Sequence, residues 1–467
     1  MTISRRSILK GIAATGAMAS TTACSTVDET KSGFERNQLS IPDQPNELLL
    51  NHPRAIEEME REGIDLLLCA DPVNVYYLTN QQSISSKIGA DGFTFAALPA
   101  SSLRKPIYIG NQISYYFDAS PESVTKNIDL QFYAAPADME SFLQIDNPQD
   151  LIAAPATDGF LLRQHTEQQQ SVLESSRRKQ VETQVSEINA SIDAAILSVI
   201  FEADLPNKTI AIDNQSLRGI IERSGLDVKI VDGERLLRRV RLQKSPAEII
   251  MMRYIAQANS LAALTAAKTV REGATFRELR REFAKECGQY MCNAKYMMLD
   301  THSPTLADGE IRDGRSFLID CVSVFEGYHG DYGRTVCIGE PNRKMKSIID
   351  TLSNVWDRIL PELQPGLSYT DLYALSARLF AESKVDAGFA INPHSVGLHH
   401  SDDPGKADFS PPFIREDVVL KEGMILSVDM PVLDLGQGGT AHLEDLVLIG
   451  SNGPELLNDT NNRFIVV

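Results

Sequence analysis

The stretch FLIDCVSVFEGYHGDYGRT, residues 317–335, decides how the second half of this 467-residue chain folds. Residues 317–319 form an apolar run that ends at Asp320, which predicts a strand carrying a carboxylate to the edge of a core. Asp331 follows eleven residues later, and Glu326 and Gly327 between them are suited to a turn. We therefore expect a β-hairpin in which both aspartates face one pocket. Two carboxylates at close range repel each other and raise one pKa, and a divalent cation would remove that cost.

Further acidic and imidazole groups lie in strand-like or turn-like segments towards the C-terminus. His394 lies in residues 392–404, Asp429 in residues 424–431 and Glu444 in residues 441–448. Acids inside apolar strands need a reason, because burying a charge is costly. Four carboxylates with one imidazole suit a pair of divalent ions such as Mn²⁺, Co²⁺ or Zn²⁺. Two such ions can share a bridging water, lower its pKa and polarise a carbonyl group.

Strand and helix patterns divide the mature chain into two domains. Their alternation over residues 46–235 predicts an α/β domain, in which residues 53–64 form a helix, 65–69 a buried strand and 71–74 a turn. The pattern changes near Lys244, where Ser245, Pro246 and Glu248 have the features of a helix start. We expect a second, α+β domain over residues 241–467, with helices at 246–269, 276–288, 343–361 and 369–383 and strands at 315–321, 334–338, 424–432 and 442–449. Six of the eight histidines lie in this second domain, which is the first indication of where the function resides.

The composition excludes several classes of protein. The chain has 45 Lys and Arg residues against 63 Asp and Glu residues, a net charge of −18, which argues against binding to nucleic acid. Its six cysteines are too few and too scattered for a disulfide scaffold or a cysteine-based zinc site, so we expect buried or idle thiols.

The first 24 residues have the features of an export signal. Arg5 and Arg6 precede an uncharged, small-residue stretch at residues 11–23, which resembles a twin-arginine signal and is too short to span a bilayer. Cys24 follows Ala23 and is a candidate for lipid attachment, although Thr21 and Thr22 depart from the usual lipoprotein pattern, so lipidation stays open. Residues 25–45 are polar and proline-containing and are typical of a tether. We therefore expect a periplasmic or exported protein, either free or anchored through Cys24.

Together these segments resemble one known group of proteins. The matching residues are 65–79, 239–253, Asp320 to Thr335 with its closing Asp-x-x-Arg-Thr, His394 with Gly397 and Leu398, and the segments around Asp429 and Glu444. They are similar to the metallopeptidase family of aminopeptidase P, prolidase and methionine aminopeptidase. The resemblance implies an α/β creatinase-like N-terminal domain followed by an α+β catalytic domain with the pita-bread fold.

The resemblance also implies a role for each candidate metal ligand. Asp331 and Glu444 would bridge two metal ions. Asp320 would complete the first site, and His394 and Asp429 would complete the second. Glu444 or Asp429 would manage the proton of the bridging water.

Four further histidines are candidates for catalysis or substrate binding by the same resemblance. His400 would steady the tetrahedral intermediate. His302, 18 residues before Asp320, lies close to where the family has a substrate-binding histidine. His399 and His442 are the other candidates for contact with the substrate.

The sequence departs from the family pattern at four positions. The family usually has Glu where this chain has Asp429, and many members have Arg where it has His442. The second histidine normally follows the first by seven residues; here that position is Ser401, so His400 serves only if the loop is one residue shorter. Proline-specific members carry a further histidine where this chain has Ala390. The resemblance therefore supports the metal site more strongly than Xaa-Pro specificity.

Three functions are compatible with this sequence. The first is an exported, metal-dependent hydrolase of the Xaa-Pro aminopeptidase or prolidase type, acting on a small peptide or a related C–N bond through a bridging hydroxide. The second is a metal-free, creatinase-like amidinohydrolase, which the retention of most metal ligands disfavours. The third is a non-catalytic binding protein on the same fold. The resemblance implies a homodimer in each case.

Overall fold

The computed structural model describes residues 39–43, 45–111, 126–157, 188–402, 417–433, 439–458 and 462–467. The predicted export signal and Cys24 lie outside the described residues, as does most of the polar tether. None of the described helices is long and apolar enough to cross a membrane. The five described cysteines are all buried thiols without a disulfide.

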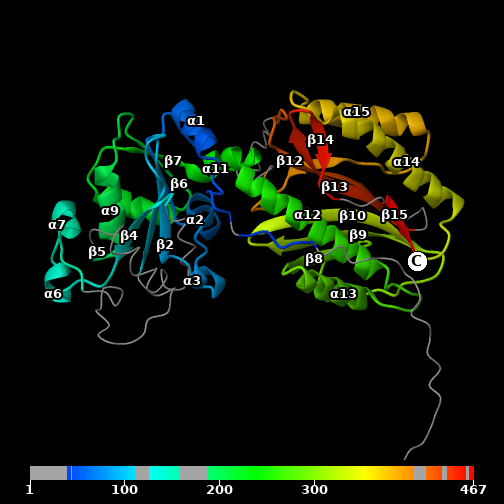
Figure 1. Ribbon diagram of the computed structural model, residues 1–467, viewed down its shortest axis with the longest axis horizontal. Helices are drawn as coiled ribbons and strands as arrows, with labels where there is room; N and C mark the ends of the chain where they lie inside the picture. The colour runs from blue at the N-terminus through cyan, green and yellow to red at the C-terminus, as the bar shows by residue number, and fades with distance from the viewer. Residues whose placement is uncertain are drawn as a thin grey trace, which may run out of the picture. The chain divides into compact units, whose positions relative to one another are not determined.

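The first sheet is mixed and has seven strands. Its central strand β2 runs antiparallel to both neighbours, β1 and β3 (Figure 1). On one side β6 runs parallel to β1, and on the other β4 and β5 continue parallel to β3. In spatial order the strands are β5 (Ile188–Asn189), β4 (Asp129–Tyr133), β3 (Ile107–Asn111), β2 (Thr94–Pro99), β1 (Leu66–Cys69), β6 (Thr209–Ile212) and β7 (Lys229–Asp232). The helices of this region are α1 (His52–Glu62), α2 (Pro72–Thr79), α3 (Ile84–Lys87), α6 (Met139–Phe142), α7 (Pro148–Ile152), α9 (Ile192–Glu202), α10 (Arg218–Arg223) and α11 (Gly233–Leu242), with the 3₁₀ turn η2 (Gln215–Leu217).

One local prediction in this region is wrong. The expected turn at residues 71–74 is the first turn of helix α2. Asp71 caps the helix by accepting a hydrogen bond from the Val73 backbone N–H, and Pro72 occupies the first helical position. The expected helix at residues 53–64 is α1, which ends where Gly63 adopts a left-handed conformation with φ of 63°.

The second sheet carries the candidate site. Its spatial order is β11 (Asn392–Ser395), β12 (Ile425–Val432), β13 (Ala441–Gly450), β10 (Tyr328–Cys337), β9 (Ser316–Phe325) and β8 (Asn293–Leu299), and each neighbouring pair is antiparallel. Two short strands extend it, with β14 (Gly453–Leu456) beside β13 and β15 (Phe464–Val466) beside β10. The expected strands and helices of this half are therefore present, and the sheet is largely antiparallel, as an α+β domain requires.

Four long helices cover this second sheet. Helix α12 (Pro246–Ala267) packs on β9 and β10, and α13 (Phe276–Gln289) packs on α12 and β8. Helix α14 (Arg343–Ile359), continued by η3 (Leu360–Glu362), packs on β13 and beside α15 (Tyr369–Ser383) (Figure 1). The capping box expected at Ser245 and Glu248 is formed, so the start of α12 is fixed by the sequence itself.

Candidate metal centre

The β9–β10 hairpin places Asp320 and Asp331 on one face of the sheet. Asp331 pairs with Val322, two residues along β9 from Asp320, and residues two apart in a strand share a face. The turn residues Glu326 and Gly327 both have positive φ, 46° and 83°, as a tight hairpin turn of the right twist requires. The predicted hairpin is therefore confirmed.

The other candidate ligands come from the strands that continue the sheet. Glu444 on β13 pairs with Gly333 of β10 on one side and with Asp429 of β12 on the other. His394 lies on β11, which pairs with β12. Five adjacent strands, β11, β12, β13, β10 and β9, thus supply one predicted ligand each, in the order His394, Asp429, Glu444, Asp331 and Asp320.

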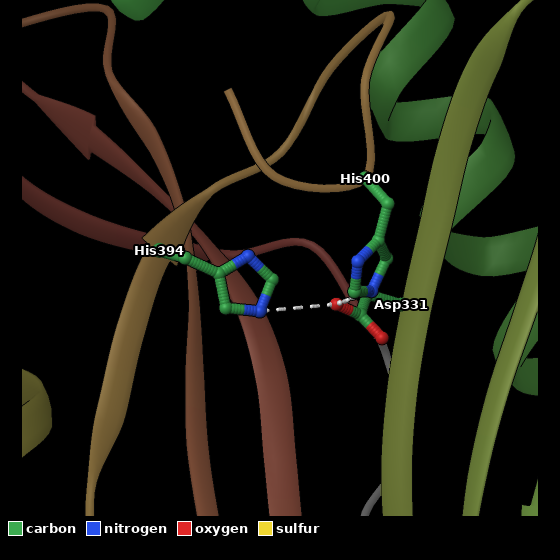
Figure 2. A group of neighbouring side chains, drawn as sticks. All are labelled: Asp331, His394 and His400. Atoms are coloured by element: carbon green, nitrogen blue, oxygen red, sulfur yellow. Dashed lines mark ion pairs between the residues drawn. The ribbon is translucent and has the colours of Figure 1, made fainter. Parts of the chain in front are cut away.

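The ligand atoms of these side chains converge. One oxygen from each of Asp320, Asp331 and Glu444 lies within 4.8 Å of the others. His394 Nε2 is 3.6 Å from Asp331 Oδ2 and 4.0 Å from Glu444 Oε1 (Figure 2). Asp429 and Glu444 form a further group of the same size with His442. These separations suit ions placed between the groups, because ligands of one divalent ion lie about 2.0–2.6 Å from it.

The electrostatics of the cluster favour a bound cation. Burial, followed by repulsion from Asp331, raises the pKa of Glu444 well above its usual range and raises that of Asp320 to about 7. Burial also acts to raise the pKa of Asp331, but the hydrogen bond and charge of His400 outweigh it and the pKa of Asp331 is lowered. Asp320 Oδ1, Asp331 Oδ1 and Glu444 Oε2 are buried without a hydrogen-bond partner among the described residues. Buried oxygens of this kind need a proton or a metal ion.

His400 lies at this centre. Its Nε2 is 3.1 Å from Asp331 Oδ2 and 3.0 Å from the Tyr296 hydroxyl oxygen, and its ring centroid is 5.0 Å from that of His394 (Figure 2). The structure therefore brings the predicted catalytic histidine to the metal ligands. Tyr296, on β8, was not predicted from the sequence; in the fold it pairs with Val322, two residues along β9 from Asp320.

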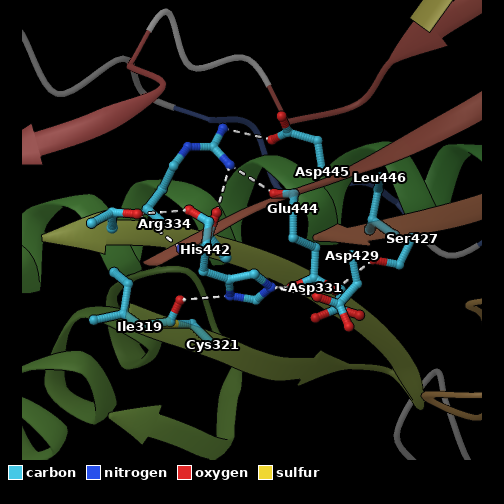
Figure 3. A network of polar contacts seen from close by, with 12 residues as sticks. Ile319, Cys321, Asp331, Arg334, Ser427, Asp429, His442, Glu444, Asp445 and Leu446 are labelled. Carbon is cyan, nitrogen blue, oxygen red and sulfur yellow. Dashed lines mark hydrogen bonds and ion pairs between the residues drawn. The ribbon is translucent and has the colours of Figure 1, made fainter. Parts of the chain in front are cut away.

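His442 is buried beside the carboxylates. Its Nε2 is 2.5 Å from Asp429 Oδ1 and its Nδ1 is 3.3 Å from the Ile319 carbonyl oxygen (Figure 3). Only 2 % of this side chain is exposed, so it contacts the candidate ligand Asp429 from within the core. Its predicted contact with substrate stays a prediction.

The remaining two predicted histidines do not join this group. His302 packs edge-on against Phe276 and its carbonyl oxygen accepts from Arg280. Burial lowers the pKa of His399, and the next largest influences on it come from Arg241 and Asp402, a buried ion pair outside the carboxylate cluster. Their substrate-binding roles are not supported by a contact with the cluster, and they too stay predictions.

Side chains behind the acidic residues hold them in place. The sequence alone did not predict these contacts. Ser427 Oγ donates to Glu444 Oε1 over 2.7 Å. The buried Arg334 donates from Nη1 to the Glu444 carbonyl oxygen and from Nη2 to Asp445, both over 2.7 Å (Figure 3). Ser427 could have been found by strand periodicity, since it lies two residues before Asp429 on the same face.

The fold and the carboxylate–imidazole cluster define a class, that of metal-dependent hydrolases with a pita-bread catalytic domain. Residues 250–451 match the sequence model of metallopeptidase family M24. The expectation of a metallopeptidase fold and enzyme is therefore confirmed.

Individual relatives agree with this classification. A Xaa-Pro dipeptidase of Pyrococcus horikoshii is 24% identical over 272 residues, which cover 55% of this chain and 75% of the relative. A Xaa-Pro dipeptidase of Pyrococcus furiosus is 24% identical over 49% of this chain and 67% of the relative. Among solved structures, a prolidase from Pyrococcus furiosus has a TM-score of 0.58 at 17% identity, covering 87% of this chain and 100% of that one. A variant of Escherichia coli aminopeptidase P has a TM-score of 0.58 at 16% identity, covering 88% of this chain and 95% of that one. At these identities the two structures show a shared fold.

Proposed function

We propose that this chain is a prolidase-type peptidase that holds two divalent metal ions and cleaves short peptides before proline. The observation that carries the proposal is that five adjacent strands each carry one candidate ligand, and that the groups of converging ligand atoms share Asp331 and Glu444. The names of the Pyrococcus relatives supply the Xaa-Pro substrate.

The donor set fits two ions. Asp320, Asp331 and Glu444 would hold one ion through oxygen, and Asp331, His394, Asp429 and Glu444 would hold the other. Oxygen-rich sites with one imidazole suit Mn²⁺, Co²⁺ or Zn²⁺. The buried oxygens that lack a hydrogen-bond partner would then be satisfied by coordination.

Two ions held by these residues would supply an acidified water and a polarised carbonyl group. The residues of the chain provide the rest of the reaction. Glu444 is suited to accept the proton of the attacking water, because its carboxyl belongs to both of the ligand groups between which that water would bind. The same carboxyl can then give this proton to the nitrogen of the leaving proline as the C–N bond breaks. His400, held between Asp331 and Tyr296, is placed to donate a hydrogen bond to the oxygen of the scissile carbonyl.

The cellular setting forms part of the proposal. The twin-arginine pattern at Arg5 and Arg6 and the uncharged stretch after it support export to the periplasm, with Cys24 as the candidate lipid anchor. A homodimer follows from the resemblance to the family. Mass spectrometry of the mature N-terminus and light scattering of the purified chain test these two points.

The experiment that tests the function is a metal count combined with a substrate comparison. The metal-free chain is reconstituted with Mn²⁺, Co²⁺ and Zn²⁺ in turn, and the metal per protomer and the hydrolysis of Ala-Pro and Ala-Ala are measured. We expect about two equivalents of metal and faster cleavage of Ala-Pro. Asp331→Asn and Glu444→Gln should lose both metal and activity, whereas the matched control Asp350→Asn, at an exposed ion pair on α14, should lose neither. No stoichiometric metal under any condition would overturn the proposal in favour of the metal-free or non-catalytic alternatives.

A further inference from the structure

His400 lies in the loop that follows strand β11. The Asp402 backbone N–H donates to the Ser395 carbonyl oxygen over 3.1 Å, and this bond closes residues 395–402 into a loop. His400 lies two residues before the point of closure. Because a closed loop of this length has few conformations, the groups that hold Asp402 also restrict where the imidazole of His400 can lie.

Two arginines of helix α11 hold Asp402 in place. Asp402 Oδ1 accepts a hydrogen bond from Arg241 Nε over 2.9 Å, and the two side chains are buried, with 0 % and 1 % exposed. The Asp402 carbonyl oxygen accepts from Arg238 Nε over 2.8 Å. The side chain and the backbone of Asp402 are therefore both bound to one helix, which fixes the closing residue of the loop in position and in direction.

Arg241 is itself held by further hydrogen bonds. Its Nη2 donates to Glu234 Oε1 over 2.9 Å, and its Nη1 donates to Asn74 Oδ1 over 2.5 Å. Asn74 Nδ2 in turn donates to Asp213 Oδ2 over 3.0 Å. The guanidinium that anchors the loop thus belongs to a polar network with partners on α2, on α11 and just after β6, and it cannot follow a movement of the loop.

A buried lysine lies beneath the same loop. Lys244 Nζ donates to the Arg241 carbonyl oxygen over 2.6 Å and to Ser395 Oγ over 3.3 Å. A Cβ atom at Gly397 would lie 3.1 Å from Lys244 Nζ and 3.3 Å from Asp402 Oδ2, so the loop backbone packs directly on both side chains. Close packing of this kind leaves little space for a second path of the loop.

We propose that the buried Arg241–Asp402 ion pair positions His400 at the metal centre. The proposal rests on the function proposed above, in which His400 donates a hydrogen bond to the scissile carbonyl oxygen. Arg241 and Asp402 are then positioning residues, which act on the reaction through His400. His400 Nε2 lies 3.1 Å from Asp331 Oδ2 and 3.0 Å from the Tyr296 hydroxyl oxygen, and displacing a catalytic group by about 1 Å can lower the rate about 100-fold.

The first part of the test removes the carboxylate of Asp402. Removing Asp402 is milder than removing Arg241, because the guanidinium keeps Glu234 as a partner. In the metal-loaded chain, Asp402→Ala should lower kcat for Ala-Pro about 10- to 100-fold, change KM by less than about threefold and leave the metal per protomer unchanged. Asp402→Asn should restore most of kcat, because its amide oxygen can still accept from Arg241 Nε.

A double-variant cycle separates positioning from a general loss of structure. In the His400→Ala background, Asp402→Ala should lower kcat by less than about twofold, because the group through which Asp402 acts is absent. Glu58→Gln is the matched control, since Glu58 is a buried carboxylate that pairs with Arg54 and Arg61. It should lower the melting temperature and leave kcat within about twofold. Multiplicative losses in the double variant, loss of metal in Asp402→Ala or an unchanged kcat would overturn the proposal.

A second variant and a structural measurement cover the remaining outcomes. Arg241→Lys keeps the buried charge, but one ammonium group cannot bind Asp402, Asn74 and Glu234 together, so kcat should fall about 3- to 10-fold even if Asp402→Ala does not fold. A chain without peptidase activity would overturn the proposed function, and the anchor is then tested alone by crystal structures of the unmodified chain and Arg241→Lys. Displacement of His400 from Asp331 by about 1 Å or more supports the anchor, and an unchanged position overturns it.

Discussion

Replacing Arg334 by methionine tests how the strands beneath the metal centre are held together. Arg334 is fully buried, and its guanidinium donates to Asp445 Oδ1 over 2.7 Å, to the Glu444 carbonyl oxygen over 2.7 Å and to the Asn462 carbonyl oxygen over 2.7 Å. Methionine fills a similar volume but donates no hydrogen bond. The substitution therefore leaves a buried carboxylate and two carbonyl oxygens without their main donor.

The size of the expected loss in the free energy of unfolding follows from the burial of Asp445. Removing one partner of a buried ion pair costs about 3–5 kcal/mol, because the other charge remains in a medium of low dielectric. Arg463, whose Nη1 is 3.8 Å from Asp445 Oδ2, is a second cation that offsets part of this cost. We therefore expect a loss near the lower end, about 3 kcal/mol in the free energy of unfolding.

The assay is urea unfolding of the metal-free chain followed by circular dichroism. Asp445→Asn and the double variant complete a cycle, in which we expect a coupling of about 1–3 kcal/mol between the two positions. Arg358→Met breaks an exposed ion pair with Glu382 and serves as the control, with an expected loss below about 1 kcal/mol. A loss below about 1 kcal/mol in Arg334→Met, or additive effects in the double variant, would refute the reasoning.

Two further predictions concern the geometry and the charge of the centre. A Cβ atom at Gly333 would overlap the ring of His442, so Gly333→Ala should displace that ring from Asp429 and weaken binding of the second ion by about 10-fold, as measured by calorimetric titration. Gly219→Ala, where the added Cβ meets no atom within 4 Å, is the control, and similar metal affinities in both variants would contradict the argument. In the metal-free chain the pKa of Asp320 is raised to about 7 and that of Glu444 is also raised, whereas unfolded carboxyl groups titrate near pH 4. The folded state therefore binds more protons between about pH 4 and pH 7, and stability from these groups is lost as the pH rises through this window. The melting temperature of the metal-free protein, prepared with a chelator, should fall from pH 5 to pH 7.5 relative to that of the metal-loaded protein. The same dependence of melting temperature on pH in both forms would contradict this prediction.

The sequence predicts the β9–β10 hairpin and its ligands well, because local signals agree there with the fold. Strand alternation, a turn that needs positive φ at Gly327, and two aspartates at an odd spacing all point to the same arrangement. The same agreement holds at the start of α12, where Ser245 caps the helix. It fails at residues 71–74, whose aspartate and proline are compatible with a turn or with the start of a helix. There the cap at Asp71 decides in favour of α2.

Groups that meet across strands are harder to predict than groups within one strand. The contact of Tyr296 with His400 depends on a shift of register between β8 and β9, and nothing in the residues around Tyr296 marks the shift. Arg334 is visible as part of a motif, but its contact with Asp445 depends on the pairing of β10 with β13. His399 and His400 are adjacent in sequence, yet only His400 contacts Asp331, and backbone direction in the loop decides between them.

The pairing of β12 with β13 explains the departures at Asp429 and His442 together. In the sequence they look like two unrelated changes: Asp429 has a shorter side chain than the usual Glu, and His442 is a smaller base than the Arg of many members. In the sheet, Asp429 lies opposite Glu444 and His442 lies opposite Pro431, so the two side chains are diagonal neighbours, and His442 Nε2 contacts Asp429 Oδ1 at 2.5 Å. The ring fits there because position 333 is glycine, and its Nδ1 contacts the Ile319 carbonyl oxygen. One oxygen of Asp429 is thus occupied by the imidazole, which fixes the shorter carboxylate in direction and leaves its other oxygen for a metal ion. A change at either position alone would separate the pair, so the two departures act as one alteration of the proposed second metal site.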